Sequence, residues 1–208
     1  MRDARPIIFV VDDDPSVRDS LELLLRSVSL DVKTFASAQE FLDVAPPGTA
    51  GCLILDIRMP GMDGLDLQER CVKAGFFLQI IFITGHGTVP MSVRAMKAGA
   101  IDFLQKPFEE QDLLNAINRA IERDRRATRE RDELGEIQQR VNALSPREYE
   151  VFNLLVAGLS NKQVAYRLGT TERTIKAHRA RVMEKMRAGS LADLGRSAEK
   201  LNLSRPHD

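Results

Sequence analysis

The sequence predicts an α/β domain followed by a smaller all-α domain, and three observations lead to this prediction. Short apolar runs alternate with amphipathic stretches through the first 118 residues, a charged segment follows, and every periodic stretch after Ser145 is helical. Strands that each precede a helix are typical of a doubly wound parallel sheet with helices on both faces. We therefore expect a (βα)5 domain, a long linker helix and a small helix-turn-helix domain, at residues 1–122, 123–141 and 142–208.

Five apolar runs are the predicted strands, because buried parallel strands read as continuous apolar segments. They lie at Ile7–Val11, Val32–Phe35, Cys52–Leu55, Ile80–Ile83 and Phe103–Gln105. The helices that follow them are predicted at Pro15–Val28, Ala38–Val44, Leu65–Ala74, Val89–Ala98 and Glu109–Ile121. Folds of this kind place their site outside the carboxyl ends of the strands, so we look for chemistry there.

The segment 122–140 is rich in Glu, Arg and Asp and holds almost no apolar residue. Opposite charges recur four residues apart, as in Arg129 and Glu133, and such pairs support an exposed helix. We interpret the segment as a solvated linker helix, with Gly135 as a break near its end. A coiled coil is the alternative, although an apolar seam is missing between Ile121 and Leu134.

Four short helices are predicted after the linker, at residues 146–157, 161–168, 171–187 and 191–200. Capping-box patterns begin at Ser145, Ser160 and Ser190, and a fourth begins at Ser37 in the first domain. The second and third of these helices are joined by the tight turn at Gly169. Their spacing is that of a helix-turn-helix.

The composition favours a soluble protein of the cytoplasm. Hydrophobic residues make up 43% of the 208 residues, which is enough for ordinary globular cores. Cys52 and Cys71 have neither disulfide nor metal-type spacing, which favours a reducing compartment. The run Ile7–Val11 is too short for a signal peptide, and no run approaches the roughly 20 residues of a membrane span, so no membrane partner is expected.

The charge is divided unevenly along the chain, although the formal net charge is zero. Residues 1–118 carry 11 basic and 17 acidic residues, and residues 142–208 carry 12 basic and 7 acidic residues. A polyanionic partner is therefore expected for the second domain rather than for the first.

Polar residues follow the ends of four predicted strands, where an apolar sheet would not otherwise place them. They are Asp12 and Asp13, Asp56, Thr84, and Lys106. Clustered carboxylates suit a hard cation such as Mg²⁺. A carboxylate beside Mg²⁺ can act as a nucleophile on phosphorus, and a nearby lysine and hydroxyl can bind the transferred oxygens.

These motifs resemble the receiver domain of two-component response regulators, which has a flavodoxin-like fold. The likeness covers about residues 5–122 and rests on four stretches in order, Val10–Asp14, Leu55–Gly64, Thr84–Gly87 and Lys106–Phe108. It implies that Asp56 accepts the phosphoryl group. It also implies that Asp13 binds Mg²⁺ directly, while Asp12 acts through water.

The resemblance assigns roles to the other residues as well. The backbone carbonyl of Arg58 becomes a further ligand of Mg²⁺, beside Asp13 and Asp56. Thr84 and Lys106 contact the phosphoryl group, and Phe103 is the switch aromatic. A cis bond is implied between Lys106 and Pro107. Arg58 and His86 become the variable pair that tunes phosphoryl lifetime. Independently of the resemblance, Asp14 and Asp63 are predicted to be N-caps of the helices that follow them.

The predicted second helix of the helix-turn-helix has two different faces at about 100° per residue. Ile175, Val182 and Met186 share the apolar face. The opposite face holds Arg173, Lys176, Ala177, Ala180, Arg181 and Glu184. Small side chains among cations can approach a DNA major groove closely, and the helix start at Thr171 suits a phosphate. Arg179 falls near the apolar edge.

The stretches Leu144–Glu148, Asn161–Ala165 and Thr174–Arg179 resemble a LuxR-type helix-turn-helix over about residues 142–203. Together with the receiver, they resemble the FixJ/NarL subclass, whose members include regulators of aromatic-compound catabolism such as styrene degradation. The resemblance aligns Lys176, Ala177 and Ala180 with base-facing positions, and Ala180 stands where other members carry Lys. His178 is interpreted as a structural residue. The predicted DNA contacts are Thr171, Arg173, Thr174, Lys176, Ala177, Ala180 and Arg181.

The function that follows is a phosphorylation-dependent transcriptional regulator, of the activating kind that the family favours. Its expected partners are a cognate sensor histidine kinase, promoter DNA, RNA polymerase and, on phosphorylation, a second copy of the chain. It is not expected to be an enzyme, apart from Mg²⁺-dependent self-phosphorylation and dephosphorylation at Asp56.

The sequence disfavours three alternative functions. An aspartyl-phosphate phosphohydrolase would need a second Asp two residues after the nucleophile, where this chain has Arg58. A DNA-binding module with a vestigial receiver would not need the acidic pair, Thr84 and Lys106. An RNA-binding output lacks an aromatic stacking platform.

Overall fold

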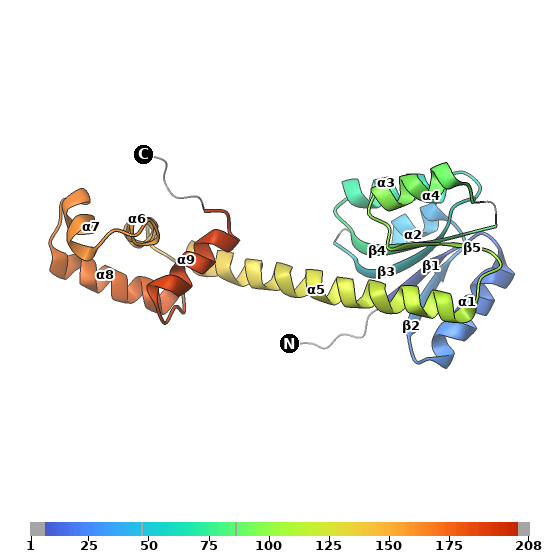
Figure 1. Cartoon of the computed structure of the whole chain (residues 1–208), viewed down its shortest axis with the longest axis horizontal. Helices are drawn as coiled ribbons and strands as arrows, with labels where there is room; N and C mark the ends of the chain where they lie inside the picture. The colour runs from blue at the N-terminus through green and yellow to red at the C-terminus, as the bar shows by residue number, and fades with distance from the viewer. Residues whose placement is uncertain (1–6, 47, 86, 204–208) are drawn as a thin grey trace. The chain divides into compact units, whose positions relative to one another are not determined.

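The computed structural model describes residues 7–46, 48–85 and 87–203, which form two compact units. The first unit covers Met1–Ala127 and the second Thr128–Asp208 (Figure 1). Each unit has a hydrophobic core of its own. Among the described residues, no helix has the length and apolarity that crossing a membrane requires.

The first unit is a five-stranded parallel sheet of order β2-β1-β3-β4-β5. Its strands are β1 (Ile7–Val11), β2 (Asp31–Phe35), β3 (Ala50–Asp56), β4 (Phe77–Thr84) and β5 (Asp102–Gln105). Four of its helices are α1 (Pro15–Ser27), α2 (Ala38–Val44), α3 (Gly64–Lys73) and α4 (Val89–Lys97). The predicted doubly wound fold is confirmed, and β3 and β4 extend beyond their predicted apolar runs.

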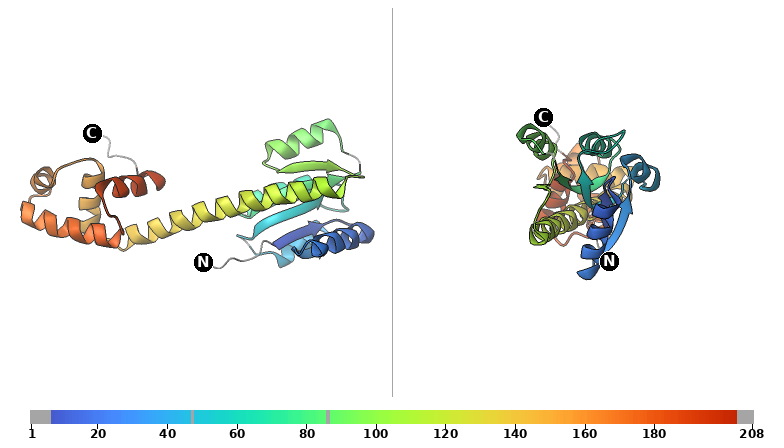
Figure 2. Two further views of the ribbon diagram at one scale, coloured as in Figure 1. Left: turned by 60° about the horizontal axis from the view of Figure 1, so that its bottom comes forward. Right: turned by 90° about the vertical axis from the view of Figure 1, so that its right-hand side faces the viewer.

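Helices cover both faces of this sheet, as Figure 2 shows. A fifth helix, α5 (Glu110–Asn142), follows β5. On one face of the sheet, α1 and the start of α5 pack over Ile8, Val10 and Ile54, with Leu21 and Leu25 of α1 in this core. On the other face, α2, α3 and α4 pack over Phe9, Leu53 and Phe82. Cys52 and Cys71 are buried and free, in agreement with the absence of a predicted disulfide.

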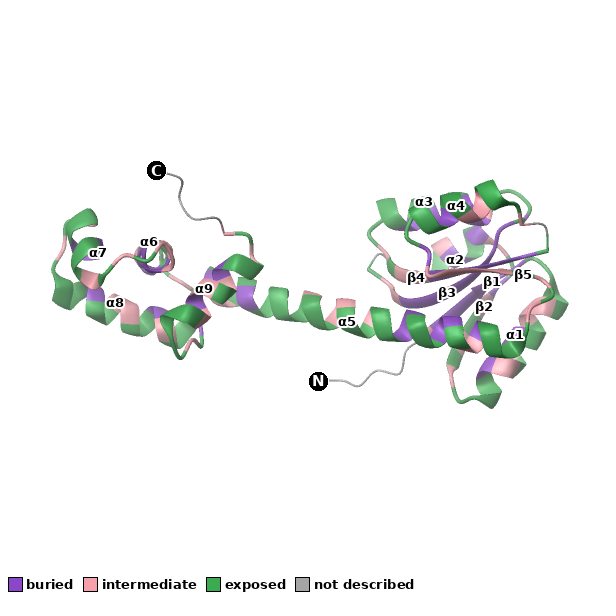
Figure 3. Ribbon diagram, in the orientation of Figure 1, coloured by how far each residue is buried: buried purple, intermediate pink, exposed green. Residues whose placement is uncertain are grey.

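Helix α5 is continuous over 33 residues, so the predicted long linker helix is confirmed. Its first turns belong to the core of the first unit, and Ile137 and Val141 belong to the core of the second. No residue from 122 to 136 is buried (Figure 3). The predicted break at Gly135 is wrong, because the helix runs through it. The predicted pairing of Glu133 with Arg129 is also wrong, since Glu133 pairs with Lys200.

The second unit adds four helices, α6 (Pro146–Val156), α7 (Asn161–Arg167), α8 (Glu172–Lys185) and α9 (Leu191–Lys200). Its core is aliphatic apart from Phe152. The predicted capping boxes at Ser145 and Ser160 are complete. Those at Ser37 and Ser190 are half formed, because their acidic partners accept from the amide one residue earlier, at Ala36 and Gly189.

Candidate functional site

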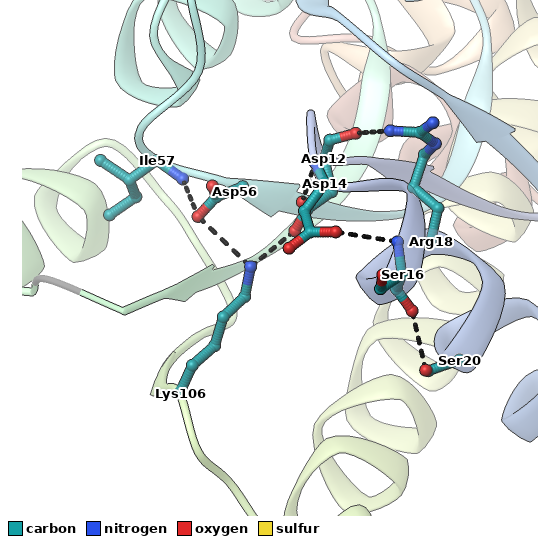
Figure 4. Close-up of polar contacts among 8 residues, drawn as sticks. All are labelled: Asp12, Asp14, Ser16, Arg18, Ser20, Asp56, Ile57 and Lys106. Atoms are coloured by element: carbon teal, nitrogen blue, oxygen red, sulfur yellow. Dashed lines mark hydrogen bonds and ion pairs between the residues drawn. The ribbon is translucent and has the colours of Figure 1, made fainter.

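The carboxyl ends of four neighbouring strands carry the predicted polar residues of the first unit, and Figure 4 shows Asp12, Asp56 and Lys106 close together there. Asp12 follows β1, Asp56 ends β3, Thr84 ends β4, and Lys106 follows β5. The Lys106 ammonium lies 2.6 Å from Asp12 Oδ2 and 3.8 Å from Asp56 Oδ1. Residues separated by up to 94 positions in the sequence therefore form one polar cluster at this edge of the sheet.

Asp12 is fully buried, and each of its polar groups has a hydrogen-bond partner. Its amide donates to the carbonyl of Phe35 (3.2 Å), and its own carbonyl accepts from the Arg18 guanidinium (2.7 Å). Its carboxylate accepts from the amide of Asp14 (2.9 Å) and from Lys106. Buried carboxylates need such partners, so the carboxylate of Asp12 is held in one orientation.

Asp56 is 7% exposed and has fewer partners than Asp12. Its Oδ1 accepts from the amide of Ile57 at 2.9 Å. Burial raises the pKa of Asp56 above its ordinary value, and Asp12 and Asp13 act in the same direction. Lys106 and the Ile57 amide oppose this rise in pKa without cancelling it. The ionised carboxylate of Asp56 is thus short of compensating charge.

Three carboxylates form a candidate cation site, as the sequence predicts. Oxygen atoms of Asp12, Asp13 and Asp56 all lie within 4.8 Å of one another. Asp13 is exposed, so solvent reaches the group. The donor set is all oxygen and strongly anionic, which suits a hard divalent ion such as Mg²⁺ and not a soft one. The Lys106 ammonium is the nearby cation that the structure itself supplies.

Thr84, fully buried, and Phe103, half-buried, lie on the neighbouring strands β4 and β5. The Phe103 ring lies 6.4 Å from that of Phe82, measured between ring centroids. The carbonyl of Thr84 accepts from the amide of Lys106 at 2.8 Å, which connects the ends of the two strands. The Lys106–Pro107 bond is cis, as predicted. His86, of the predicted variable pair, lies outside the described residues, and the side chain of Arg58 is exposed.

The second unit contains the predicted helix-turn-helix. Val164 and Ala165 of α7 and Ile175 and Val182 of α8 share one core. Gly169 turns the chain between the two helices with φ of 60°. Thr171 is the N-cap of α8 rather than its first residue, and its hydroxyl accepts from the Thr174 amide at 3.2 Å.

The two predicted faces of α8 are confirmed. Ile175, Val182 and Met186 are buried. The opposite face is exposed over Arg173, Lys176, Ala177, Ala180, Arg181 and Glu184. Within the part of the chain that the structure describes, Arg173 and Arg181 have no ion-pair partner, whereas Lys176 lies 3.4 Å from Glu172. Two unpaired arginines on either side of two alanines leave this face open to a polyanion.

Two residues near the edge of α8 now have a structural account. Arg179 donates to Asn161 Oδ1 at 3.3 Å, so it joins α8 to α7. His178 is half-buried, and its Nδ1 is buried without a hydrogen-bond partner among the described residues.

Sequence reasoning missed two features that the structure brings into view. Arg18 holds the main chain at Asp12. Glu148, 4% exposed, accepts from Lys185 (2.6 Å) and from the amide of Ser145 (2.8 Å). Both cations look like ordinary surface residues in the sequence. The one sequence signal for Arg18 is its position, since it lies in the first turn of a helix that directly follows the acidic cluster.

Comparisons with known proteins agree with both halves of the structure. Residues 8–118 match the response regulator receiver domain, and residues 142–198 match the bacterial regulatory proteins of the luxR family. Nodulation protein W of Bradyrhizobium diazoefficiens is 50% identical over 203 residues, which cover 98% of this chain and 89% of that protein. Transcriptional regulatory protein FixJ of Azorhizobium caulinodans is 44% identical, covering 92% of this chain and 90% of that protein.

A solved structure is similar along nearly the whole chain. The low-resolution structure of the response regulator StyR has a TM-score of 0.85 and 48% identity, and the match covers 95% of this chain and all of that one. The class defined by fold and site is thus a receiver joined to a helix-turn-helix. The chain belongs to the two-component response regulators of the FixJ/NarL type, with a LuxR-family DNA-binding domain.

Proposed function

We propose that Asp56 accepts a phosphoryl group from the phosphohistidine of a sensor kinase and that this controls DNA binding by α8. The observation that carries the proposal is the cluster at Asp56, where Lys106 and two further carboxylates lie beside a buried carboxylate. In the transfer, a carboxylate oxygen of Asp56 forms a bond to phosphorus. The phosphorus–nitrogen bond breaks, and its electron pair returns to the imidazole of the kinase.

Asp13, Asp56 and the backbone carbonyl of Arg58 would hold Mg²⁺ directly, with Asp12 binding through water. When bound there, Mg²⁺ neutralises the carboxylates and offsets the charge on the transferred oxygens. Lys106 now lies on Asp12 and is 3.8 Å from Asp56. We assign it to the phosphoryl oxygens once transfer has occurred, together with the hydroxyl of Thr84. The chain has no other enzymatic activity in this proposal than its own phosphorylation and dephosphorylation.

The output of the switch is assigned to the surface of α4, β5 and α5. Thr84 ends the strand that leads to α4, and Phe103 lies in β5. Val89, Val93 and Met96 of α4 are exposed apolar residues. A surface of this kind can pair with a second copy of itself, which gives a homodimer on phosphorylation. Each copy then presents one α8 to one half-site of promoter DNA.

The division of labour along the chain follows. Residues 1–122 act as the receiver, 123–141 as the linker and 142–208 as the DNA-binding domain. Arg173, Lys176, Arg181 and the start of α8 at Thr171 and Thr174 contact DNA, with Ala177 and Ala180 against base edges. The bound dimer recruits RNA polymerase in the cytoplasm, as an activator does.

Transfer from radiolabelled acetyl phosphate tests the first step. With Mg²⁺, the wild-type chain should become labelled and Asp56→Asn should not. Asp66→Asn, at an exposed position of α3, is the matched control and should be labelled like the wild type. Label that persists on Asp56→Asn would refute the assignment of the acceptor.

Salt dependence of DNA binding tests the second step. Arg181→Ala should make the salt dependence shallower. The magnitude of the slope of log affinity against log salt should fall by about 1, because one phosphate contact is lost. Arg125→Ala, in the exposed linker, should leave the slope unchanged. Equal slopes for wild type and Arg181→Ala would remove Arg181 from the interface.

A further inference from the structure

The start of α3 lies directly against the main chain of the candidate acceptor, Asp56. A Cβ added to Gly64, the first residue of α3, would overlap the carbonyl oxygen of Asp56. It would also lie 3.0 Å from Cα of Ile57 and 3.1 Å from the carbonyl carbon of Asp56. Gly64 does not have a positive φ, so the close approach of two main-chain segments, and not the backbone conformation, requires glycine here.

Ile57 connects this helix start to the carboxylate of Asp56 by two hydrogen bonds. Its carbonyl accepts from the Gly64 amide at 2.8 Å, and its amide donates to Asp56 Oδ1 at 2.9 Å. The N–H of the first residue in a helix has no partner within the helix, so the bond to Ile57 docks α3 on the end of β3. Asp56 Oδ1 is also the oxygen that lies 3.8 Å from the Lys106 ammonium.

The turn between β3 and α3 is anchored at both ends. Leu55 of β3 and Leu67 of α3 are fully buried in one core. A side chain at position 64 would push the start of α3 away from the end of β3, and close-packed cores yield little to such pressure. The turn of residues 57–63 must therefore absorb the displacement, and this turn includes the backbone carbonyl of Arg58.

We propose that Gly64 is a positioning residue of the acceptor site. By lacking a side chain, it lets α3 begin against the Asp56 carbonyl, and so it sets the turn that orients the Asp56 carboxylate and the Arg58 carbonyl. The inference rests on the proposed function, in which these two oxygens bind Mg²⁺. Gly64 itself touches neither the metal nor the phosphoryl group.

A second glycine of the same strand provides the matched control. Gly51 lies near the start of β3, at the opposite edge of the sheet from Asp56. A Cβ there would lie 2.6 Å from the carbonyl oxygen of Ile7, and φ is +131°. Alanine at position 51 or 64 should therefore lower the melting temperature of the first unit, because each is forced against a neighbouring main chain. Only Gly64→Ala should disturb the acceptor site.

Titration calorimetry and amide NMR of the full chain measure this effect at temperatures well below the melting transition. In Gly64→Ala, the dissociation constant for Mg²⁺ should rise about tenfold to a hundredfold, as it does when a group that orients metal ligands is altered. The amide resonance of Ile57 should also move in the metal-free chain, because its hydrogen bond to Asp56 is disturbed. Gly51→Ala should keep the wild-type value of both.

Several outcomes would overturn the proposal. They are an unchanged Mg²⁺ affinity or an unmoved Ile57 amide in folded Gly64→Ala, and equal losses of affinity in the two glycine variants. If Gly64→Ala does not fold, the wild type decides: the Gly64 amide should shift with the Ile57 amide as Mg²⁺ is added, and a Gly64 amide that stays in place overturns the proposal. If the wild type takes neither Mg²⁺ nor label from acetyl phosphate, the proposed function fails, and the Ile57 amide of metal-free Gly64→Ala still decides whether Gly64 positions Asp56.

Discussion

Asp56 and Glu148 are both buried carboxylates, one in each unit, and their surroundings act on them in opposite directions. Burial raises the pKa of Asp56, which has one amide partner and an ammonium 3.8 Å away. The hydrogen bond from Lys185, together with the Ser145 amide, lowers the pKa of Glu148 to about 2. The surroundings of Asp56 disfavour its ionised form, and those of Glu148 favour the ionised form.

The difference matches the role proposed for Asp56 and the structural contacts of Glu148. The donors that would satisfy Asp56 are partly withheld, because Lys106 is closer to Asp12, and in the proposed function this leaves the Asp56 carboxylate available to an incoming electrophile. The donors of Glu148 are all in place, and they join the end of α5, the start of α6 and the end of α8. A poorly compensated carboxylate is typical of a reactive site, and a fully compensated one of a structural site.

Removal of Glu148 should have the largest effect on stability. In Glu148→Ala, the Lys185 ammonium and the Ser145 amide both lose their acceptor, and a gap is left in the core. We expect the melting temperature of the second unit to fall by on the order of 10 °C. Calorimetry that separates the two unfolding transitions measures this fall. Glu150→Ala, at an exposed position paired with Arg147, is the control and should shift the transition little.

Neutralising Asp56 should raise stability, whereas removing Glu148 should lower it. Without Mg²⁺, Asp56→Asn removes a carboxylate that is costly to ionise, so the melting temperature of the first unit should rise by about 2–5 °C. Saturating Mg²⁺ should stabilise the wild type by preferential binding to the folded state and should stabilise Asp56→Asn much less. The order of the two melting temperatures should then reverse. A lower metal-free melting temperature for Asp56→Asn would contradict the comparison.

The two carboxylates should also respond to acid in opposite ways. The pKa of Asp56 is raised in the folded chain, so its penalty is present at neutral pH and disappears as pH falls below that raised value. The pKa of Glu148 is lowered from 4.5 to about 2, so its contribution is complete above 4.5 and is lost as pH falls toward 2. The advantage of metal-free Asp56→Asn over the wild type should therefore shrink on acidification, while the deficit of Glu148→Gln persists to lower pH. Melting temperatures over a pH series test both trends.

The smallest expected effect concerns Lys106, whose ammonium now occupies part of the candidate cation site. Lys106→Met removes this competing charge from Asp12, so Mg²⁺ should bind about threefold to tenfold more tightly. Titration calorimetry of the metal-binding step measures the change, with the exposed Lys97→Met as the control. Weaker binding of Mg²⁺ to Lys106→Met would show that the lysine supports the metal site rather than competing for it.

The sequence allowed the sheet, its order of elements and the convergence of Asp12, Asp56, Thr84 and Lys106 to be predicted. Such a prediction is possible because continuous apolar runs define buried strands, and the carboxyl ends of parallel strands share one edge. The exposed face of α8 was equally readable, since helical periodicity separates it from the buried Ile175 and Val182.

Side-chain pairings between distant segments could not be predicted in this way. Lys106 lies closer to Asp12 than to Asp56, and Lys185 donates to Glu148, which is 37 positions away in the sequence. Both pairings depend on how whole helices and strands pack together. The prediction of a helix break at Gly135 is wrong for a related reason. Glycine costs a helix about 1 kcal/mol relative to alanine, and the anchoring of Ile137 and Val141 in the second core compensates for that cost.

Residues 122–136 of α5 belong to neither hydrophobic core, and this has a practical and an evolutionary consequence. No residue from 122 to 136 is buried, so replacement of an exposed side chain there, other than Glu133, which pairs with Lys200, removes little from the packing of either core. Descendants of this chain are free to drift at these positions provided that they keep helix-forming residues. The same stretch is where a dye or an affinity tag can be attached while leaving both cores undisturbed.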